Sequence, residues 1–140
     1  MADVHFSFNA PDRLLTACHL AAAHYREGGR LAVYCSDKRR LHAYNRLLWE
    51  YERGAFVPHL PAADPLAERT PIVLYDSPPP AEARIVLNLD DACVPEAQAY
   101  ERILEVVGGG DAERERARRR WRDYQQAGHT IHRQDIANAE

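Results

Sequence analysis

The sequence has no long apolar run. Its apolar stretches are short, with the most continuous ones at residues 31–35, 72–75 and 85–89, whereas a helix that spans a membrane needs about 20 apolar residues. The first residues enter an alternating apolar pattern directly, without a basic segment or a cleavage pattern. We therefore expect neither a signal peptide nor contact with a membrane.

Cysteine is scarce, and the usual cofactor signatures are missing. The three cysteines, Cys18, Cys35 and Cys93, are far apart and none lies in a Cys-x-x-Cys pair, which favours free thiols in a reducing, cytoplasmic setting. The seven histidines are scattered without a zinc-binding spacing. Neither Gly-x-Gly-x-x-Gly nor a P-loop occurs. We predict no metal and no cofactor.

An excess of positive charge is also missing. The 18 Lys and Arg residues are outnumbered by 21 Asp and Glu residues, so the formal net charge is −3. Attraction of nucleic acid by the surface as a whole is not indicated, and any basic site has to be local. A chain of 140 residues is long enough to bury a core, and we expect one domain over residues 1–140.

The apolar patterns alternate between strands and helices along the chain. Strands are predicted at 4–8, 31–35, 72–75 and 85–89, helices between Asp12 and Gly28 and between Asp37 and Gly54, an extended segment at 56–61, and a short helix at 95–100. Residues 103–107 fit either a continuation of that helix or a strand, and their β-branched pair favours the strand. This order predicts an α/β fold with a mostly parallel sheet.

The last third of the sequence carries the most unusual pattern. After Gly108-Gly109-Gly110, a helix is predicted over residues 111–127 with Gly128 at its C-terminal end, and residues 129–140 are expected to fray. Arg114, Arg118, Trp121 and Arg122 follow at positions i, i+4, i+7 and i+8, so they share one helical face.

Guanidinium groups around an indole suit an acidic peptide, a terminal carboxylate or a phosphate backbone, because arginine binds such groups through paired hydrogen bonds. The alternative interpretation is a solvated helix. In that case the acidic residues Glu113, Glu115 and Asp123 pair with the arginines along the same helix.

The sequence offers little support for catalysis. Cys35 follows a predicted strand, but a phosphatase-like loop needs an arginine after five intervening residues, and no glycine is present to wrap a phosphate. We predict that Cys35 is a core thiol and that the chain has no catalytic residue. Asp90-Asp91 suits a turn better than a cation site. A protein-binding module is therefore favoured, with Trp49 and Phe56 either as interface anchors or as cover for the sheet edge.

Three segments together resemble a known family. They are Leu47-Leu48-Trp49, then Phe56-Val57-Pro58-His59, then Arg118-x-Arg120-Trp121-Arg122-x-Tyr124 with Ala127-Gly128. In this combination, and over essentially its whole length, the chain resembles the chi subunit of bacterial DNA polymerase III, an accessory of the clamp loader. The resemblance implies a Rossmann-like three-layer sandwich without nucleotide binding or catalysis.

The resemblance also implies two partners. One is the psi subunit, which tethers chi to the clamp loader, and Trp49 and Phe56 match the positions that contact it. The other is the acidic C-terminal tail of single-stranded DNA-binding protein, which ends in proline and phenylalanine. Arg114, Arg118, Trp121 and Arg122 match the positions that bind this tail, so nucleic acid is contacted only indirectly. Two alternatives stay open: direct nucleic-acid binding by the arginine helix, and a small hydrolase that uses Cys35.

Overall fold

The computed structural model describes residues 2–51 and 57–136. Within these residues the strands are β1 (Asp3–Ala10), β2 (Leu31–Tyr34), β3 (His59–Pro61), β4 (Ile72–Tyr75), β5 (Ile85–Asn88), β6 (Arg102–Gly108) and β7 (Thr130–Asp135), and the helices are α1 (Arg13–Arg26), α2 (Lys38–Glu50) and α3 (Asp111–Gln126). The strands form one sheet in the order β3-β4-β2-β5-β6-β1-β7, and each described pair is parallel.

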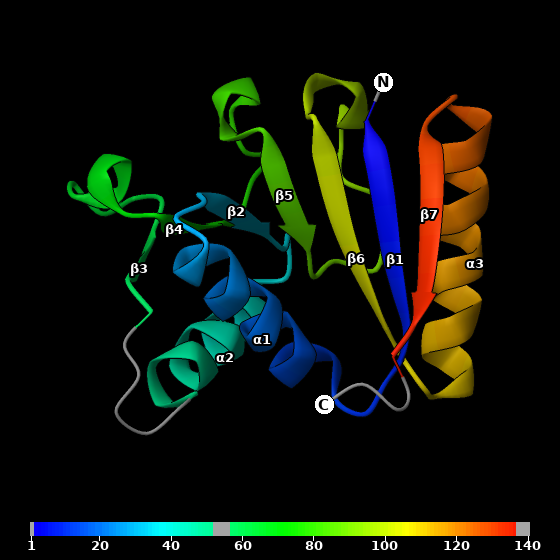
Figure 1. Ribbon diagram of the computed structural model, residues 1–140, viewed down its shortest axis with the longest axis horizontal. Helices are drawn as coiled ribbons and strands as arrows, with labels where there is room; N and C mark the ends of the chain where they lie inside the picture. Colours follow the sequence, from blue (N-terminus) through cyan, green and yellow to red (C-terminus); the bar gives the residue numbers. More distant parts are fainter. Residues whose placement is uncertain (1, 52–56, 137–140) are drawn as a thin grey trace.

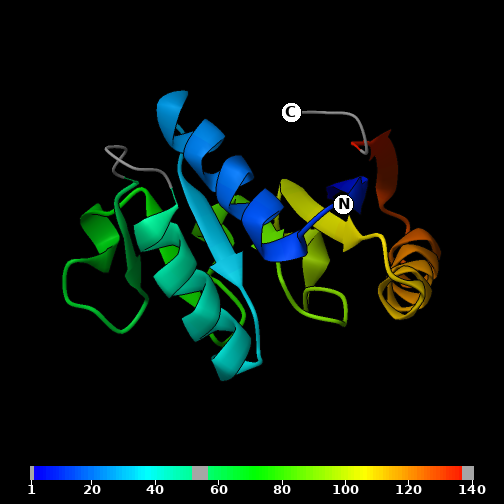
Figure 2. The same ribbon diagram turned by 90° about the horizontal axis from the view of Figure 1, so that it is seen from below.

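Helices cover both faces of the sheet (Figures 1 and 2). α1 and α2 pack together on one face over a core that includes Tyr44 and Leu87, while α3 lies on the other face over a core that includes Phe6 and Tyr124. Each sheet face is therefore buried against helix, which is why strands such as β2 are apolar on both sides. The predicted Rossmann-like three-layer α/β sandwich is confirmed.

The helices begin and end where the polar and glycine residues predict. Asp12 caps α1 by accepting a hydrogen bond from the Leu15 N–H at 3.1 Å, and Asp37 caps α2 through the Arg39 N–H at 3.0 Å. Gly128 follows α3 with φ of +90°, a left-handed conformation that glycine adopts without strain. Gly54, expected to close α2, lies outside the described residues.

Two uncertain segments are now defined. Residues 103–107 belong to strand β6, as the β-branched residues indicated. The short helix expected at 95–100 is a single 3-10 turn over Ala97–Ala99.

The expectation of a frayed tail was wrong for β7. This strand adds to the edge of the sheet in parallel with β1. Its ends are held by backbone hydrogen bonds from the Thr130 N–H to the Ala2 carbonyl at 3.2 Å and from the Ile136 N–H to the Phe8 carbonyl at 2.9 Å. A polar edge strand gains its order from backbone pairing rather than from burial, so its own side-chain pattern gives little signal.

The chain leaves two neighbouring strands in opposite directions. β1 leads through α1 to β2 on one side, whereas β6 leads through α3 to β7 on the other side. Such a divergence in a parallel sheet opens a crevice outside the carboxyl ends of the strands. Among the described residues, no helix is long and apolar enough to cross a membrane.

Candidate functional site

A groove runs along α3 on the side that faces the ends of β1 and β7. Its volume is about 680 Å³. All four residues predicted from the helical spacing line it, together with five others: Arg114, Arg118, Trp121 and Arg122, and then Phe8, Asn9, Glu115, Ala117 and Arg133. The structure therefore brings the predicted basic face together around one concave surface.

Aromatic side chains form the floor of the groove. The Trp121 ring lies 5.1 Å from the Phe6 ring and 6.0 Å from the Phe8 ring, between ring centroids. Phe6 is fully buried, whereas Trp121 is half-buried and keeps part of its indole at the surface. The packing below holds the indole in one orientation, so it offers a fixed apolar wall.

The arginines at the rim are oriented by neutral or exposed partners. Arg114 donates from Nη2 to the Asn9 side-chain oxygen at 3.2 Å. Asn9 itself has φ of +64°, a left-handed conformation that is uncommon outside glycine and more frequent in asparagine. Arg118 pairs with Glu115 at 3.3 Å, and both side chains are more than half exposed. An exposed pair of this kind is weak, typically below about 1 kcal/mol, so the Arg118 guanidinium can exchange Glu115 for another carboxylate.

Sequence reasoning missed the second wall of the groove. Arg133 of β7 lies with its guanidinium carbon 5.2 Å from the centroid of the Phe8 ring, a cation–π contact. In the parallel register Arg133 is opposite Phe6, so both side chains point to the α3 face. The expectation that residues 129–140 fray hid this residue, and no local pattern would have revealed it.

Not every arginine of α3 faces the groove. Arg120 turns inward and donates from Nε to Oε1 of Glu105 in β6 at 3.0 Å, with both side chains almost fully buried. Glu105 Oε2 also accepts hydrogen bonds from Asn88 and from the Tyr124 hydroxyl, each at 2.7 Å. These bonds compensate the buried charges and fasten α3 to the sheet.

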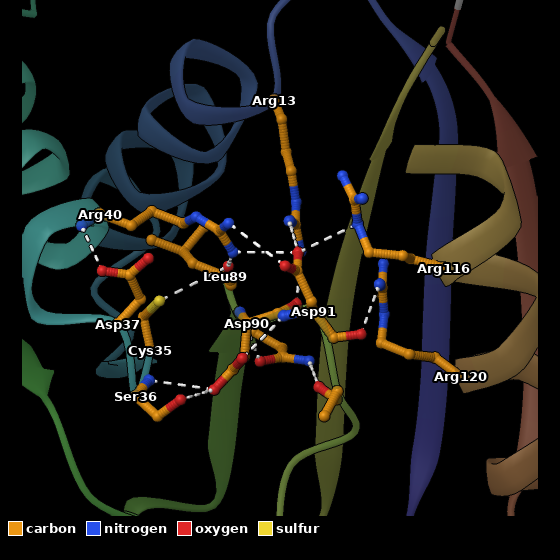
Figure 3. A network of polar contacts seen from close by, with 12 residues as sticks. Arg13, Cys35, Ser36, Asp37, Arg40, Leu89, Asp90, Asp91, Arg116 and Arg120 are labelled. Carbon is orange, nitrogen blue, oxygen red and sulfur yellow. Dashed lines mark hydrogen bonds and ion pairs between the residues drawn. The ribbon is translucent and has the colours of Figure 1, made fainter. Parts of the chain in front are cut away.

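A second ionic cluster lies where β5 ends (Figure 3). The Asp91 carboxylate is approached by Arg13 of α1 at 3.5 Å, by Arg40 of α2 at 3.1 Å and by Arg116 of α3 at 3.4 Å. Burial raises the pKa of Asp91, but the hydrogen bond and charge of Arg40 and the charges of Arg116 and Arg13 outweigh it, so the pKa is lowered. One carboxylate thus joins three helices.

The neighbouring Asp90 is engaged as well. It accepts hydrogen bonds from the Ser36 N–H at 3.0 Å and from the Ser36 hydroxyl at 2.5 Å. The Asp90-Asp91 pair is therefore part of a turn whose carboxylates already have protein partners. Within residues 2–51 and 57–136, no group of three or more His, Cys, Asp or Glu side chains is arranged to hold a metal ion.

Cys35 is placed as a core thiol. Its side chain is fully buried, and its sulfur donates to the Leu89 carbonyl oxygen at 3.6 Å. Burial raises the pKa of the Cys35 thiol. A nucleophilic cysteine needs a stabilised and accessible thiolate, so neither the accessibility nor the ionisation of Cys35 suits a hydrolase.

Of the two predicted interface aromatics, the structure describes Trp49, which lies at the opposite edge of the sheet from the groove. Trp49 on α2 is half exposed, and its ring lies 4.2 Å from the ring of His59 in the edge strand β3, between centroids. Phe56 lies outside the described residues. Trp49 lies beside His59 of β3, whereas the groove includes Arg133 of β7. β3 and β7 are the two opposite edge strands of the sheet (Figure 1).

Fold and site together define a class of protein. It is an α/β protein of Rossmann-like topology with a groove lined by arginines around an indole, a surface whose chemistry suits an anionic ligand. The chain belongs to the family described as the DNA polymerase III chi subunit, HolC, whose model matches residues 1–132. Membership makes the chain an accessory component in DNA replication.

The chain also matches individual proteins named as this subunit over most of their length. The chain is 28% identical over 120 residues to the DNA polymerase III subunit chi of Pseudomonas aeruginosa. The matched segment covers 85% of this chain and 83% of the relative. It is 25% identical over 116 residues to the protein of the same name from Escherichia coli, covering 81% and 79%. For the one from Haemophilus influenzae the identity is 23% over 122 residues, covering 86% and 85%.

Proposed function

We propose that this chain is a non-catalytic adaptor in cytoplasmic DNA replication. It links the clamp-loader complex of DNA polymerase III, through psi, to the acidic C-terminal tail of single-stranded DNA-binding protein. The observation that carries the proposal is the groove on α3, in which Arg114, Arg118, Arg122 and Arg133 surround Trp121.

The groove matches the chemistry of such a tail. A peptide that ends in proline and phenylalanine brings one aromatic ring and a terminal carboxylate, and acidic residues before them add further negative charges. The half-buried Trp121 and the Phe8 ring supply an apolar slot for the aromatic end. The guanidinium groups around that slot supply charge-assisted hydrogen bonds for the carboxylates, each contributing about 1.5–3 kcal/mol.

Arginines on two elements would hold the peptide from two sides. Arg114, Arg118 and Arg122 extend along α3, while Arg133 projects from β7. A ligand carboxylate at Arg118 replaces Glu115, the internal carboxylate that now pairs with it. This exchange favours ligands that carry several acids, because a single acid gains little over the internal pair.

We propose that psi binds at a second interface, which includes Trp49 and Phe56. Support for it comes from the half-exposed Trp49 indole at the β3 edge of the sheet. A large, partly exposed aromatic ring on a helix is a common interface anchor. The distance of this edge from the groove, at the other end of the strand order, allows both partners to bind at once.

The direct experiment is fluorescence anisotropy of a labelled acidic peptide that ends in Pro-Phe, titrated with this protein. Saturable micromolar binding is expected. The control peptide has the same sequence with an amidated C-terminus, which removes one charge and should bind about tenfold more weakly if the terminal carboxylate is gripped. Equal binding of the two peptides, or no binding in moderate salt, contradicts the proposal.

Direct binding of nucleic acid is the competing function. The exposed Arg118 and Arg119 side chains favour it, but a net charge of −3 does not. Binding of single-stranded DNA that falls steeply with salt, while the tail peptide fails to bind, would establish this alternative, because phosphate contacts release counterions.

A further inference from the structure

The end of β1 departs from a regular strand where it reaches the groove on α3. From Ser7 to Ala10, β1 advances three residues while its partner β6 advances two. One residue of β1 is therefore extra, which defines a β-bulge. Phe8 still pairs in register with β7, so the irregularity falls at Asn9, where φ is +64°.

The bulge reverses the alternation of side chains along β1. Successive residues of a regular strand point to opposite faces of the sheet. Phe6 and Phe8 pack in the core on the α3 side, but Ala10 belongs to the core under α1 and α2. At the reversal, Phe8 and Asn9 both line the groove although they are consecutive residues. The bulge thus brings an additional polar side chain into the groove.

That side chain holds an arginine of the site. Nη2 of Arg114 donates to Oδ1 of Asn9 at 3.2 Å. A guanidinium group has only donors, so it has to face the oxygen of the amide and not the nitrogen. The bond joins the end of β1 to the first turns of α3. It gives the exposed Arg114 side chain a defined direction, toward β1.

The partner that directs Arg114 carries no charge. Arg118, the next arginine along the groove, pairs with the Glu115 carboxylate at 3.3 Å, so part of its charge is compensated within the protein. Among the described residues, Arg114 forms no ion pair with a carboxylate. Its guanidinium is therefore oriented like that of Arg118, but its positive charge remains available to a ligand.

The backbone of the bulge does not require the asparagine side chain. Glycine adopts a positive φ without strain, and asparagine only tolerates it. A positive φ does not by itself mark a functional residue, since Arg84 and Glu96 also have one and neither lines the groove. Asn9 differs from these two residues because its side chain lies in the groove and contacts an arginine there.

We propose that Asn9 is a positioning residue of the acidic-peptide site, an inference that rests on the proposed adaptor function. The bulge delivers the Asn9 amide oxygen to the groove, where it directs the Arg114 guanidinium without neutralising it. An oriented side chain loses less conformational entropy when a peptide carboxylate binds. A neutral partner leaves the full charge for that carboxylate.

Anisotropy titrations with the labelled acidic peptide ending in Pro-Phe test this role. Asn9→Gly keeps a residue suited to the bulge but removes the acceptor, so affinity for the peptide should fall by about threefold to tenfold. The urea midpoint of Asn9→Gly should not fall, because glycine adopts the same φ without strain. A residue with a structural role alone would show the opposite pattern, with a lower midpoint and unchanged affinity.

Asn9→Asp separates orientation from charge. The new side chain also tolerates a positive φ and accepts a hydrogen bond from Arg114, but its charge compensates the guanidinium as Glu115 does for Arg118. Affinity for the peptide is expected to fall by about twofold to fivefold. Ser7→Ala is the control, since Ser7 precedes the bulge and does not line the groove, and it should leave the affinity unchanged.

A double-mutant cycle decides whether Asn9 acts through Arg114. Arg114→Ala itself should weaken peptide binding, and adding Asn9→Gly to it should change the affinity by less than about twofold. Losses that multiply in the double variant would overturn the inference, because Asn9 would then contact the peptide on its own. Full affinity in Asn9→Gly, while the unaltered chain binds the peptide, also overturns it and leaves the adaptor proposal standing. Absence of peptide binding by the unaltered chain overturns the adaptor proposal, and this inference with it.

Discussion

Arg120 of α3 donates from Nε to Oε1 of Glu105 in β6 at 3.0 Å, at a point where both side chains are almost fully buried. Arg120 therefore belongs to the buried face of the arginine-rich helix, which is distinct from the exposed face that carries the arginines of the groove. The buried residues of α3 are Ala117, Arg120 and Tyr124, whereas Arg114, Arg118 and Arg122 are exposed along the groove. The same residue type thus supports the fold on one side and is available to a ligand on the other.

Replacing Arg120 should destabilise the protein strongly. Arg120→Met leaves the Glu105 charge buried without its cation, which is expected to lower the free energy of unfolding by about 3–5 kcal/mol. Arg119→Met is the matched control, since Arg119 is 69% exposed and should change stability by less than about 0.5 kcal/mol. Urea denaturation measures both. A loss in Arg120→Met no larger than in the control would show that the buried pair is not needed.

The Asp91 cluster should make stability depend on acid pH. The pKa of Asp91 in the folded protein is lowered below its ordinary value of 3.8. The charged carboxylate therefore stabilises the folded protein relative to the unfolded chain. The stabilisation is present above pH 3.8 and is lost as the pH falls through the lower, folded-state pKa. We expect Asp91→Asn to be less stable than the unaltered chain at pH 7. The difference in urea midpoint should be the same at pH 5 as at pH 7 and should narrow near pH 3 and below, where the carboxylate takes up its proton. A constant difference would contradict this role.

Arg133 should matter for the peptide although it lies outside α3. Its guanidinium faces the groove over Phe8. Arg133→Ala is therefore expected to lower the affinity for the acidic peptide by about threefold to tenfold. Gln134→Ala is the control, because successive side chains of a strand point to opposite faces and Gln134 does not line the groove. Equal affinities of the two variants for the acidic peptide would show that β7 does not contribute to the peptide site.

Trp49 should affect the other partner alone. Trp49→Ala truncates a half-exposed indole at the β3 edge and is expected to weaken binding of purified psi by about tenfold or more, as for an interface anchor. Affinity for the acidic peptide should be unchanged. Calorimetry with psi and anisotropy with the peptide separate the two effects. Loss of peptide binding in Trp49→Ala would show that the two sites are not independent.

Much of the fold could be predicted because local signals and tertiary structure agree. Asp12 and Asp37 cap the helices that their positions indicate, and the apolar runs around Val33 and Leu87 form strands buried on both faces. Strand order could not be derived in this way. Parallel pairing depends on contacts between residues far apart in the sequence, and β1 pairs with β6 and β7 rather than with its neighbour along the chain.

The candidate site was predicted on one side only. Helical spacing identified Arg114, Arg118, Trp121 and Arg122, since residues three and four apart share a face. Arg133 was missed because β7 is ordered by backbone pairing at the sheet edge. One usable signal was overlooked in Glu105. A charged residue inside an apolar strand requires a buried partner, and Arg120 lies between Ala117 and Tyr124 on the inner face of α3.

The most direct test of the adaptor account compares two adjacent arginines. Arg118 and Arg119 are equally exposed and both approach Glu115, but Arg118 alone of the two lines the groove. In anisotropy titrations with the acidic peptide ending in Pro-Phe, Arg118→Ala should weaken binding by about tenfold or more, while Arg119→Ala should change it by less than about twofold. Equal weakening in both variants, or none in Arg118→Ala, would contradict a defined peptide site on α3.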